Sequence, residues 1–420
     1  MKREDIIRVF QAIGRASLES QLQNSHSGNM ARAFLNEAGQ PSLAITKSGA
    51  QKGDLSPEDI IFIDPKKPYR GQASSELVVH RAILQLPGVR ASFHAHAKQL
   101  TLAVLLTQGL KRSNSCFKLM DGPGNALFGR SLPLVKIEKA YGSTELAREV
   151  ARRLQKNVVV AVVGHGIFSR GANLVEAFFY AGIANFSGQV VKLLYRARSL
   201  IDKWRHAPKV DETAYYFCPP DNLEAADELA LFSPKTAAEK EIQKTRNRIF
   251  ASALAPFFIG SLSLREGKDV FYTERASTPV YIGGPLNQLP WVREPGGPEE
   301  YRWHWMILRK TGAAAVLRGH IAEAEAVAWD LLSAERGAHD YFEPVDVEGK
   351  FWQPRVPVLA PPVEAERFLA NLQKEKAVII RGGGVWTVGQ SGLSEALHRL
   401  SSVKDSCFYY LGLRERQTER

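Results

Sequence analysis

Three histidines stand at positions from which they could hold one metal ion together. His94 and His96 are separated by a single alanine at the end of an apolar run. Because successive side chains of a strand point to opposite faces, these two imidazoles would lie on the same face. His165 ends another apolar run at a turn flanked by glycines. Three imidazoles and a carboxylate form the ligand set of a catalytic zinc, which keeps one position for substrate, so the sequence predicts a Zn²⁺ site.

The segments around these histidines alternate between strand and helix patterns. Strands are expected around 30–34, 60–64, 89–94 and 158–163, and helices over 2–23, 76–86, 143–155 and 173–200. Mixed strands alternating with helices indicate a sheet covered by helices on both faces. We therefore expect an α/β protein, a three-layer α/β/α sandwich with a mixed central sheet.

Composition bounds the class of protein. The chain has 420 residues, of which 45% are hydrophobic and 24% charged, as in globular proteins of two or more domains. No window approaches the roughly eighteen apolar residues of a membrane helix, so no membrane partner is expected. The amino terminus lacks the apolar core of a secretory signal, and the three cysteines are widely spaced, which predicts a cytoplasmic location.

The net charge of +11 raises the question of nucleic acid binding. The basic residues are spread along the chain, however, and no helix-turn-helix, zinc-finger or RNP-type motif accompanies them. We expect no nucleic acid partner. A basic surface instead favours small anionic substrates.

An internal repeat indicates that one fold is present twice in tandem. Residues 300–304 match 76–80, and Arg318-Gly319-His320 follows His304 at the spacing by which His94 follows His80. Residues 378–386 match 160–168 in the same way. We expect a first domain over 1–205, a linker over 206–240 and a second domain over 241–420.

The two copies differ in the residues that could do chemistry. Arg318 stands in place of the first histidine, and a guanidinium cannot ligate a metal. Gly383 stands in place of His165, and Pro298-Glu299 replaces a serine pair. The second copy is therefore expected to keep the fold without a metal site.

At this point the first half resembles a known family, the class II aldolase/adducin family, which includes zinc-dependent fuculose- and rhamnulose-phosphate aldolases. The matching motifs occur in the family's order over about residues 2–200, and the degenerate repeat extends the resemblance over nearly the whole chain. The motifs are Ser27-Gly28-Asn29, Thr46-Lys47-Ser48-Gly49, the segment 53–59, Ser74-Ser75-Glu76, His94-Ala95-His96, the segment 141–146 and Gly164-His165-Gly166.

The resemblance implies that His94, His96 and His165 hold zinc, with Glu76 beside the metal as a ligand and as the acid/base that moves a proton. On the residues alone, Glu76 and His80 could instead form an i, i+4 pair on a helix face. We favour the catalytic interpretation for Glu76 and the structural one for His80. His26 and His320 are given no role.

The resemblance also assigns a site for the substrate phosphate. Its members are small residues whose main-chain amides and hydroxyls suit an oxyanion, two of them at the start of a helix. They are Gly28, Asn29, Ser48, Gly49, Ser74 and Ser75.

The implied function is a zinc-dependent lyase that cleaves a small phosphorylated ketose or keto acid by a retro-aldol reaction. Dehydratase, decarboxylase and epimerase reactions on a similar sugar phosphate stay open, as does a non-catalytic interaction module like the adducins. Family aldolases usually carry a tyrosine after the histidine pair that protonates the leaving aldehyde, whereas this chain has Asn114-Ser115-Cys116-Phe117 there. The proton donor to the leaving group is therefore left unassigned.

The family's assembly implies a homo-oligomer. Family enzymes form tetramers with sites between subunits. A tandem chain is expected to form a dimer that mimics the four-domain ring, or a tetramer.

Overall fold

The structure is a computed structural model that describes residues 2–69, 71–108, 115–197, 235–255, 257, 259–267, 270–274, 287–290, 299–332 and 341–417. Contacts between residues divide the chain into two compact units. The first includes Met1–Leu119 and Phe128–Gln189, and the second includes Met120–Leu127 and Ala230–Arg420. Each unit contains one sheet.

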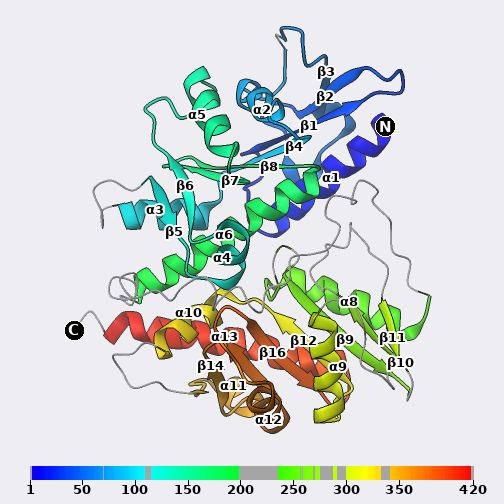
Figure 1. Ribbon diagram of the computed structural model, residues 1–420, viewed down its shortest axis with the longest axis vertical. Helices are drawn as coiled ribbons and strands as arrows, with labels where there is room; N and C mark the ends of the chain where they lie inside the picture. Colours follow the sequence, from blue (N-terminus) through cyan, green and yellow to red (C-terminus); the bar gives the residue numbers. More distant parts are fainter. Residues whose placement is uncertain are drawn as a thin grey trace. The chain divides into compact units, whose positions relative to one another are not determined.

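The first unit is built on an eight-stranded mixed sheet with the order β3-β2-β1-β4-β8-β7-β6-β5 (Figure 1). β6 and β7 run parallel, and the other neighbouring strands are antiparallel. The strands are β1 (Asn29–Leu35), β2 (Pro41–Thr46), β3 (Ile60–Ile63), β4 (Ala91–Ala95), β5 (Cys116–Lys118), β6 (Ser131–Val135), β7 (Val159–Val162) and β8 (Gly166–Gly171).

Helices precede, connect and follow these strands in the chain. They are α1 (Arg3–Glu19), α2 (Leu77–Leu84), α3 (Lys98–Gln108), α4 (Gly122–Phe128), α5 (Thr144–Leu154) and α6 (Leu174–Arg196). Helix α5 begins where it does because the Ser143 hydroxyl accepts a hydrogen bond from the Leu146 amide at 3.1 Å, which satisfies a free N–H of the first turn.

The helices cover both faces of the first sheet. On one face, apolar side chains of α2 and α5 pack on β7 and β8, and this core cluster includes Val79, Ile83, Leu146, Val150, Val160 and Phe168. On the other face α6 packs on β4, where the rings of Phe178 and Phe93 meet edge to face at 5.7 Å. Because Phe93 and His94 are neighbours on one strand, His94 points to the face that α2 covers.

The second unit contains another eight-stranded sheet, whose order β11-β10-β9-β12-β16-β15-β14-β13 repeats the first strand for strand. The parallel pair also recurs, between β14 and β15. The strands are β9 (Gly260–Glu266), β10 (Val270–Glu274), β11 (Asn287–Pro290), β12 (Ala315–Gly319), β13 (Tyr341–Phe342), β14 (Val356–Leu359), β15 (Ala377–Ile380) and β16 (Gly384–Gly389).

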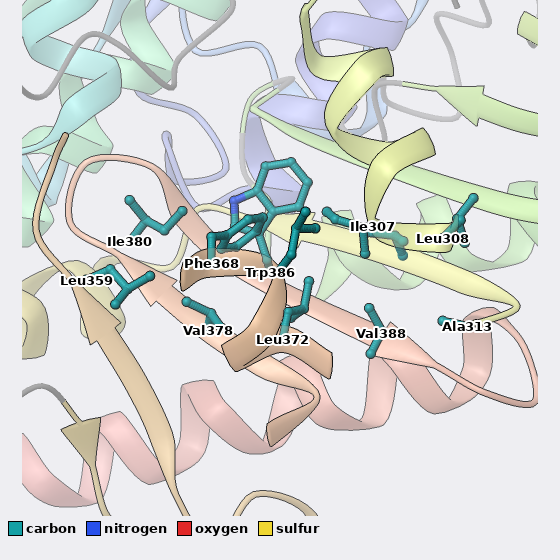
Figure 2. Close-up of a cluster of buried hydrophobic side chains, with 12 residues drawn as sticks. Ile307, Leu308, Ala313, Leu359, Phe368, Leu372, Val378, Ile380, Trp386 and Val388 are labelled. Atoms are coloured by element: carbon teal, nitrogen blue, oxygen red, sulfur yellow. The ribbon is translucent and has the colours of Figure 1, made fainter. Parts of the chain in front are cut away.

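Helices again pack on both faces. They are α8 (Ala237–Ala251), α9 (Glu299–Thr311), α10 (Ala322–Leu331), α11 (Val347–Trp352), α12 (Ala365–Glu375) and α13 (Leu393–Gln417). Figure 2 shows the core between α9, α12 and the sheet, with Trp386 and Phe368 packed together at 5.7 Å. On the opposite face α13 is bound to β16, since the Thr387 hydroxyl donates to the Ala396 carbonyl at 2.8 Å.

The predicted fold class is confirmed, because a mixed sheet with flanking helices is present and a second sheet follows it. The predicted helix over 2–23 is Arg3–Glu19, and the one over 143–155 is Thr144–Leu154. Most of the predicted linker, residues 206–234, lies outside the described residues. Helix α8 begins at Ala237, inside the linker's predicted end.

Across the described ranges, every helix is either too short or too polar to cross a lipid bilayer.

Candidate metal centre

The three predicted ligands lie together at one end of the first sheet. His94 is on β4, His96 follows that strand, and His165 lies in the turn between β7 and β8. Their ring centroids are 4.7–5.1 Å apart, and one nitrogen from each lies within 4.8 Å of the others. His94 is buried, His165 is partly buried and His96 is exposed, so the cluster is accessible from the His96 side.

Main-chain hydrogen bonding fixes the tautomer of His94. Its Nδ1 donates to the Ile167 carbonyl at 2.8 Å, which leaves Nε2 as the atom with the free lone pair. The ring stacks on Phe168 with centroids 4.2 Å apart. Nε2 lies 3.3 Å from Oε2 of Glu76. Two buried acceptor atoms facing each other require a proton or a cation between them.

The remaining electrostatics of the cluster favour lone-pair donors. Burial lowers the pKa of His165 to about 4. Burial, followed by the charges of His165 and His96, holds the pKa of His94 well below its ordinary value. Burial and then the charge of His26 lower the pKa of His96. Neutral imidazoles at physiological pH are the form that binds a metal.

Glu76 is the carboxylate of the cluster and lies at the start of α2. It is 4% exposed, and its Oε1 lies 3.6 Å from Nε2 of His165. Among the described residues, Oε1 and Nε2 of His94 have no hydrogen-bond partner. Burial raises the pKa of Glu76 to about 7, although a hydrogen bond from Asn29 opposes this shift. Unpartnered donor atoms converging on one point fit a divalent cation.

A chain of hydrogen bonds positions Glu76. The Asn29 amide donates to Oε2 of Glu76 at 3.2 Å, so its carbonyl oxygen accepts from Nε2 of His80. Nδ1 of His80 then accepts from the Ser92 hydroxyl at 2.6 Å. Burial lowers the pKa of His80 to about 3, so this ring is neutral. His80 is therefore linked to the Glu76 carboxylate through the Asn29 side chain. This differs from the direct i, i+4 side-chain pair that the sequence allowed.

The predicted phosphate residues lie on three loops that main-chain hydrogen bonds join. The Ser48 amide donates to the Gln72 carbonyl at 2.9 Å, and the Ser74 amide donates to the Thr46 carbonyl at 3.1 Å. Ser48, Gly49 and Ser75 are exposed, whereas Ser74 is buried and its hydroxyl accepts from the Glu76 amide. The side chain of Asn29 is already bound to Glu76 and His80. Phosphate binding by these residues stays a prediction.

Gly28 occupies a position where no other residue fits. Its φ of +72° lies in the left-handed region. A Cβ there would also lie 2.5 Å from the His94 carbonyl oxygen. That oxygen accepts a hydrogen bond from the buried Gln23 side chain at 2.9 Å, a contact that no sequence motif indicated. The loop before β1 is therefore held against the strand that carries two of the histidines.

The corresponding place in the second unit holds an ion pair. Arg318 donates to Oε1 of Glu300 at 2.9 Å and to the Gly383 carbonyl at 3.0 Å. Both charged side chains are 5% exposed. In the part of the chain that the structure describes, the cluster of His94, His96 and His165 is the group arranged to hold a metal. The guanidinium stands where the first unit has its histidine cluster.

Comparisons with known proteins find relatives of the first part of the chain. Residues 4–190 match the family model of the class II aldolase and adducin N-terminal domain, and this part of the chain belongs to that family. Over 138 residues the chain is 31% identical to the 5-methylthioribulose-1-phosphate/5-deoxyribulose-1-phosphate aldolase of Rhodospirillum rubrum. That match covers 32% of this chain and 59% of the aldolase, so the chain spans somewhat over half of that relative.

A second relative has a different activity in its name. The methylthioribulose-1-phosphate dehydratase of a Bradyrhizobium species is 28% identical over 178 residues, covering 39% of this chain and 80% of the dehydratase. Among solved structures, the L-fuculose-1-phosphate aldolase of Thermus thermophilus is 28% identical with a TM-score of 0.40. That match covers 49% of this chain and 99% of the aldolase.

Proposed function

We propose that the chain is a metal-dependent lyase acting on a small phosphorylated ketose or keto acid. The observation that carries this proposal is the convergence of His94, His96, His165 and Glu76 at an accessible end of the first sheet. The names of two relatives, an aldolase and a dehydratase of methylthioribulose 1-phosphate, support a phosphorylated ketose as the substrate class.

The proposed cofactor is Zn²⁺, held by the three imidazoles with Glu76 beside them. When bound, such a cation polarises a substrate carbonyl and stabilises negative charge that develops on oxygen. The chain's own contribution is to present the ligands: the Ile167 carbonyl fixes the His94 ring, and Asn29 fixes the Glu76 carboxylate. Fixing ligands through outer hydrogen bonds is a general feature of metal sites.

Glu76 is the proposed acid/base. Its free Oε1 can take a proton from a substrate hydroxyl and return it to carbon after the carbon–carbon bond breaks. The second carboxylate oxygen is held by the Asn29 amide, which leaves Oε1 to face the substrate. Gly28, Asn29, Ser48, Gly49, Ser74 and Ser75 are proposed to bind the phosphate and so to orient the sugar.

A dehydratase is the second candidate. Residues 97–118 contain no tyrosine, the residue that family aldolases usually carry there to exchange a proton with the aldehyde oxygen. The dehydratase relative is matched over 80% of its length. In that reaction Glu76 would take a proton from one carbon and deliver it to the hydroxyl group of the neighbouring carbon, which leaves as water. Decarboxylation and epimerisation are alternative reactions that would use the same Glu76 carboxylate. A non-catalytic interaction module is the alternative in which Glu76 has no catalytic role.

Two measurements on the purified full chain test the proposal. Elemental analysis should find about one Zn²⁺ per chain, lost on His94→Ala, because that ring contributes a central ligand. A panel of phosphorylated ketoses and keto acids, assayed separately for aldehyde, loss of water and carbon dioxide, would distinguish the lyases. A folded chain that binds no divalent metal would support the interaction module instead.

We also propose a division into domains 1–205 and 241–420 and a homodimer in solution. Large apolar side chains are exposed on the second unit, including Val347 (87%) and Phe351 (78%) of α11 and Phe408 (62%) of α13. We propose that these side chains form one exposed apolar patch, a feature typical of contact surfaces. Light scattering on the full chain tests this proposal, and an active monomer would contradict it.

A further inference from the structure

Lys52 is a buried lysine in the turn that follows β2. Its side chain is 1% exposed. Nζ donates to the Ala50 carbonyl at 2.7 Å and to the His26 carbonyl at 3.3 Å. Its main-chain amide donates to the Ser25 carbonyl at 2.6 Å. One residue therefore binds the loop before β1 to the loop after β2.

Burying an ammonium group is costly, so this contact needs a reason. Burial lowers the pKa of Lys52 to about 8, and the charge of Asp59 opposes the shift only in part. Both acceptors of Nζ are main-chain carbonyls. A methionine would fill similar volume at less cost in desolvation. The position thus carries a charge that packing alone does not require.

The two loops that Lys52 joins carry four of the six predicted phosphate residues. Gly28 and Asn29 follow His26, and Ser48 and Gly49 precede Ala50. The backbone at Gly49 has a φ of +74°, and the space a Cβ would occupy there is open. The Ser48 amide is bound to the Gln72 carbonyl, next to the third loop. Lys52 therefore closes a set of three connected loops.

An unused hydroxyl on the first loop points to a ligand. Ser27 Oγ is buried and has no hydrogen-bond partner within the described ranges. The loop around it is otherwise well anchored, because Asn24 Oδ1 accepts from the amides of His26 and Ser27 at 3.2 and 2.7 Å. A fixed loop that carries a free hydroxyl and is bound through its His26 carbonyl to a buried ammonium group suits an oxyanion.

We propose that Lys52 is a positioning residue of the phosphate site. Its ammonium holds the His26 and Ala50 carbonyls, so that the loops carrying Gly28 and Gly49 converge on one anion, and its charge lies behind them. The residue acts through these loops and does not contact the reacting atoms. The inference rests on the proposed function only in taking the ligand to be a phosphate.

The first test uses inorganic phosphate and the full chain. Lys52→Met removes the ammonium at similar volume, and Lys156→Met, at an exposed position of the same unit, is the matched control. We expect Lys52→Met to weaken phosphate binding in calorimetry by at least about tenfold, the size typical of losing a hydrogen bond to a charged group. Metal content should be unchanged, and the control should bind as the unmodified chain does.

The second test does not depend on how the variant folds. Hydrogen exchange of the unmodified chain, with and without phosphate, should show protection of residues 26–29 and 48–50 together. A third test returns to the variant: with an active substrate, Lys52→Met should raise KM about tenfold and change kcat by less than about threefold, since a positioning role affects binding.

Two results would overturn the inference. One is a folded Lys52→Met chain that binds phosphate within about twofold of the unmodified chain. The other is phosphate protection that spares these two loops. Phosphate binding at the loops of a chain with no lyase activity would count against the proposed function alone.

Discussion

Replacing Arg318 should destabilise the second unit by an amount that depends on pH. In Arg318→Met the carboxylate of Glu300 loses the guanidinium that lies 2.9 Å away while it stays buried. Such a carboxylate can avoid the cost of a buried negative charge by binding a proton and becoming a neutral acid. At pH 7, protonating a carboxyl of ordinary pKa near 4.3 costs about 3.7 kcal/mol, and at pH 5 about 1 kcal/mol.

The lost bond from Arg318 to the Gly383 carbonyl adds about 1 kcal/mol at either pH. The expected cost is therefore roughly 4–5 kcal/mol at pH 7 and about 2 kcal/mol at pH 5, consistent with measured losses on breaking buried ion pairs. The sign follows from the raised pKa of the stranded acid: its stabilising protonation is complete at low pH and is lost as the pH rises.

Urea unfolding followed by tryptophan fluorescence measures this change. All seven tryptophans lie beyond residue 203, so the signal is blind to the first sheet. Arg318→Met/Glu300→Met should recover most of the loss, because neither charge of this ion pair remains. Lys374→Met, whose ion pair with Glu375 is 76% exposed on the lysine side, should cost less than about 0.5 kcal/mol. A cost for Arg318→Met that is equal at pH 5 and pH 7 would refute the reasoning.

Three further predictions concern the metal centre. His94→Ala should lower bound Zn²⁺ from about one equivalent to below about 0.1 without unfolding the chain, as elemental analysis and circular dichroism would show. Glu76→Gln should keep the metal but lower kcat at least about a hundredfold. The metal-free chain should become less stable as the pH rises from 5 to 8, because burial raises the folded pKa of Glu76 to about 7. Glu76→Gln should abolish this loss of stability. Arg318→His/Gly383→His should give the second unit a metal site, seen as a second equivalent of Zn²⁺; no added metal would contradict the correspondence of the two sites.

Much of this site could be predicted from sequence because its ligands obey local rules. The spacing of His94 and His96 places both imidazoles at one end of a strand, and the glycines around His165 indicate a turn. The helix that carries Glu76 was also expected. These features depend only on residues close together in the chain and on the order in which the family motifs follow one another.

The hydrogen bonds that position the site could not be predicted in this way. Asn29 reaches Glu76 because β1 pairs with β4 in the register that sets Asn29 opposite His94. A one-residue change of register would point Asn29 to the opposite face. Lys52 was passed over for a similar reason, since a lysine in a polar turn is usually exposed and only the packing of two distant loops buries it.

The two units together separate what the fold needs from what the chemistry needs. His304 corresponds to His80, and its Nδ1 lies 2.6 Å from a hydroxyl just as that of His80 does. The hydroxyl comes from a different strand in each unit. In the first unit Ser92 on β4 supplies it and pairs with Ala31 of β1.

In the second unit Ser263 on β9, the counterpart of β1, supplies the hydroxyl and pairs with Val316 of β12. The serine and its apolar partner have thus changed strands between the two units. The serine hydroxyl still contacts the histidine ring in both. A buried imidazole needs a partner at each nitrogen, and either strand can provide it. Because this contact is kept where Arg318 replaces a histidine of the cluster, the helix-to-sheet bond of His80 and His304 serves the fold, and Glu76 uses it in the first unit through Asn29.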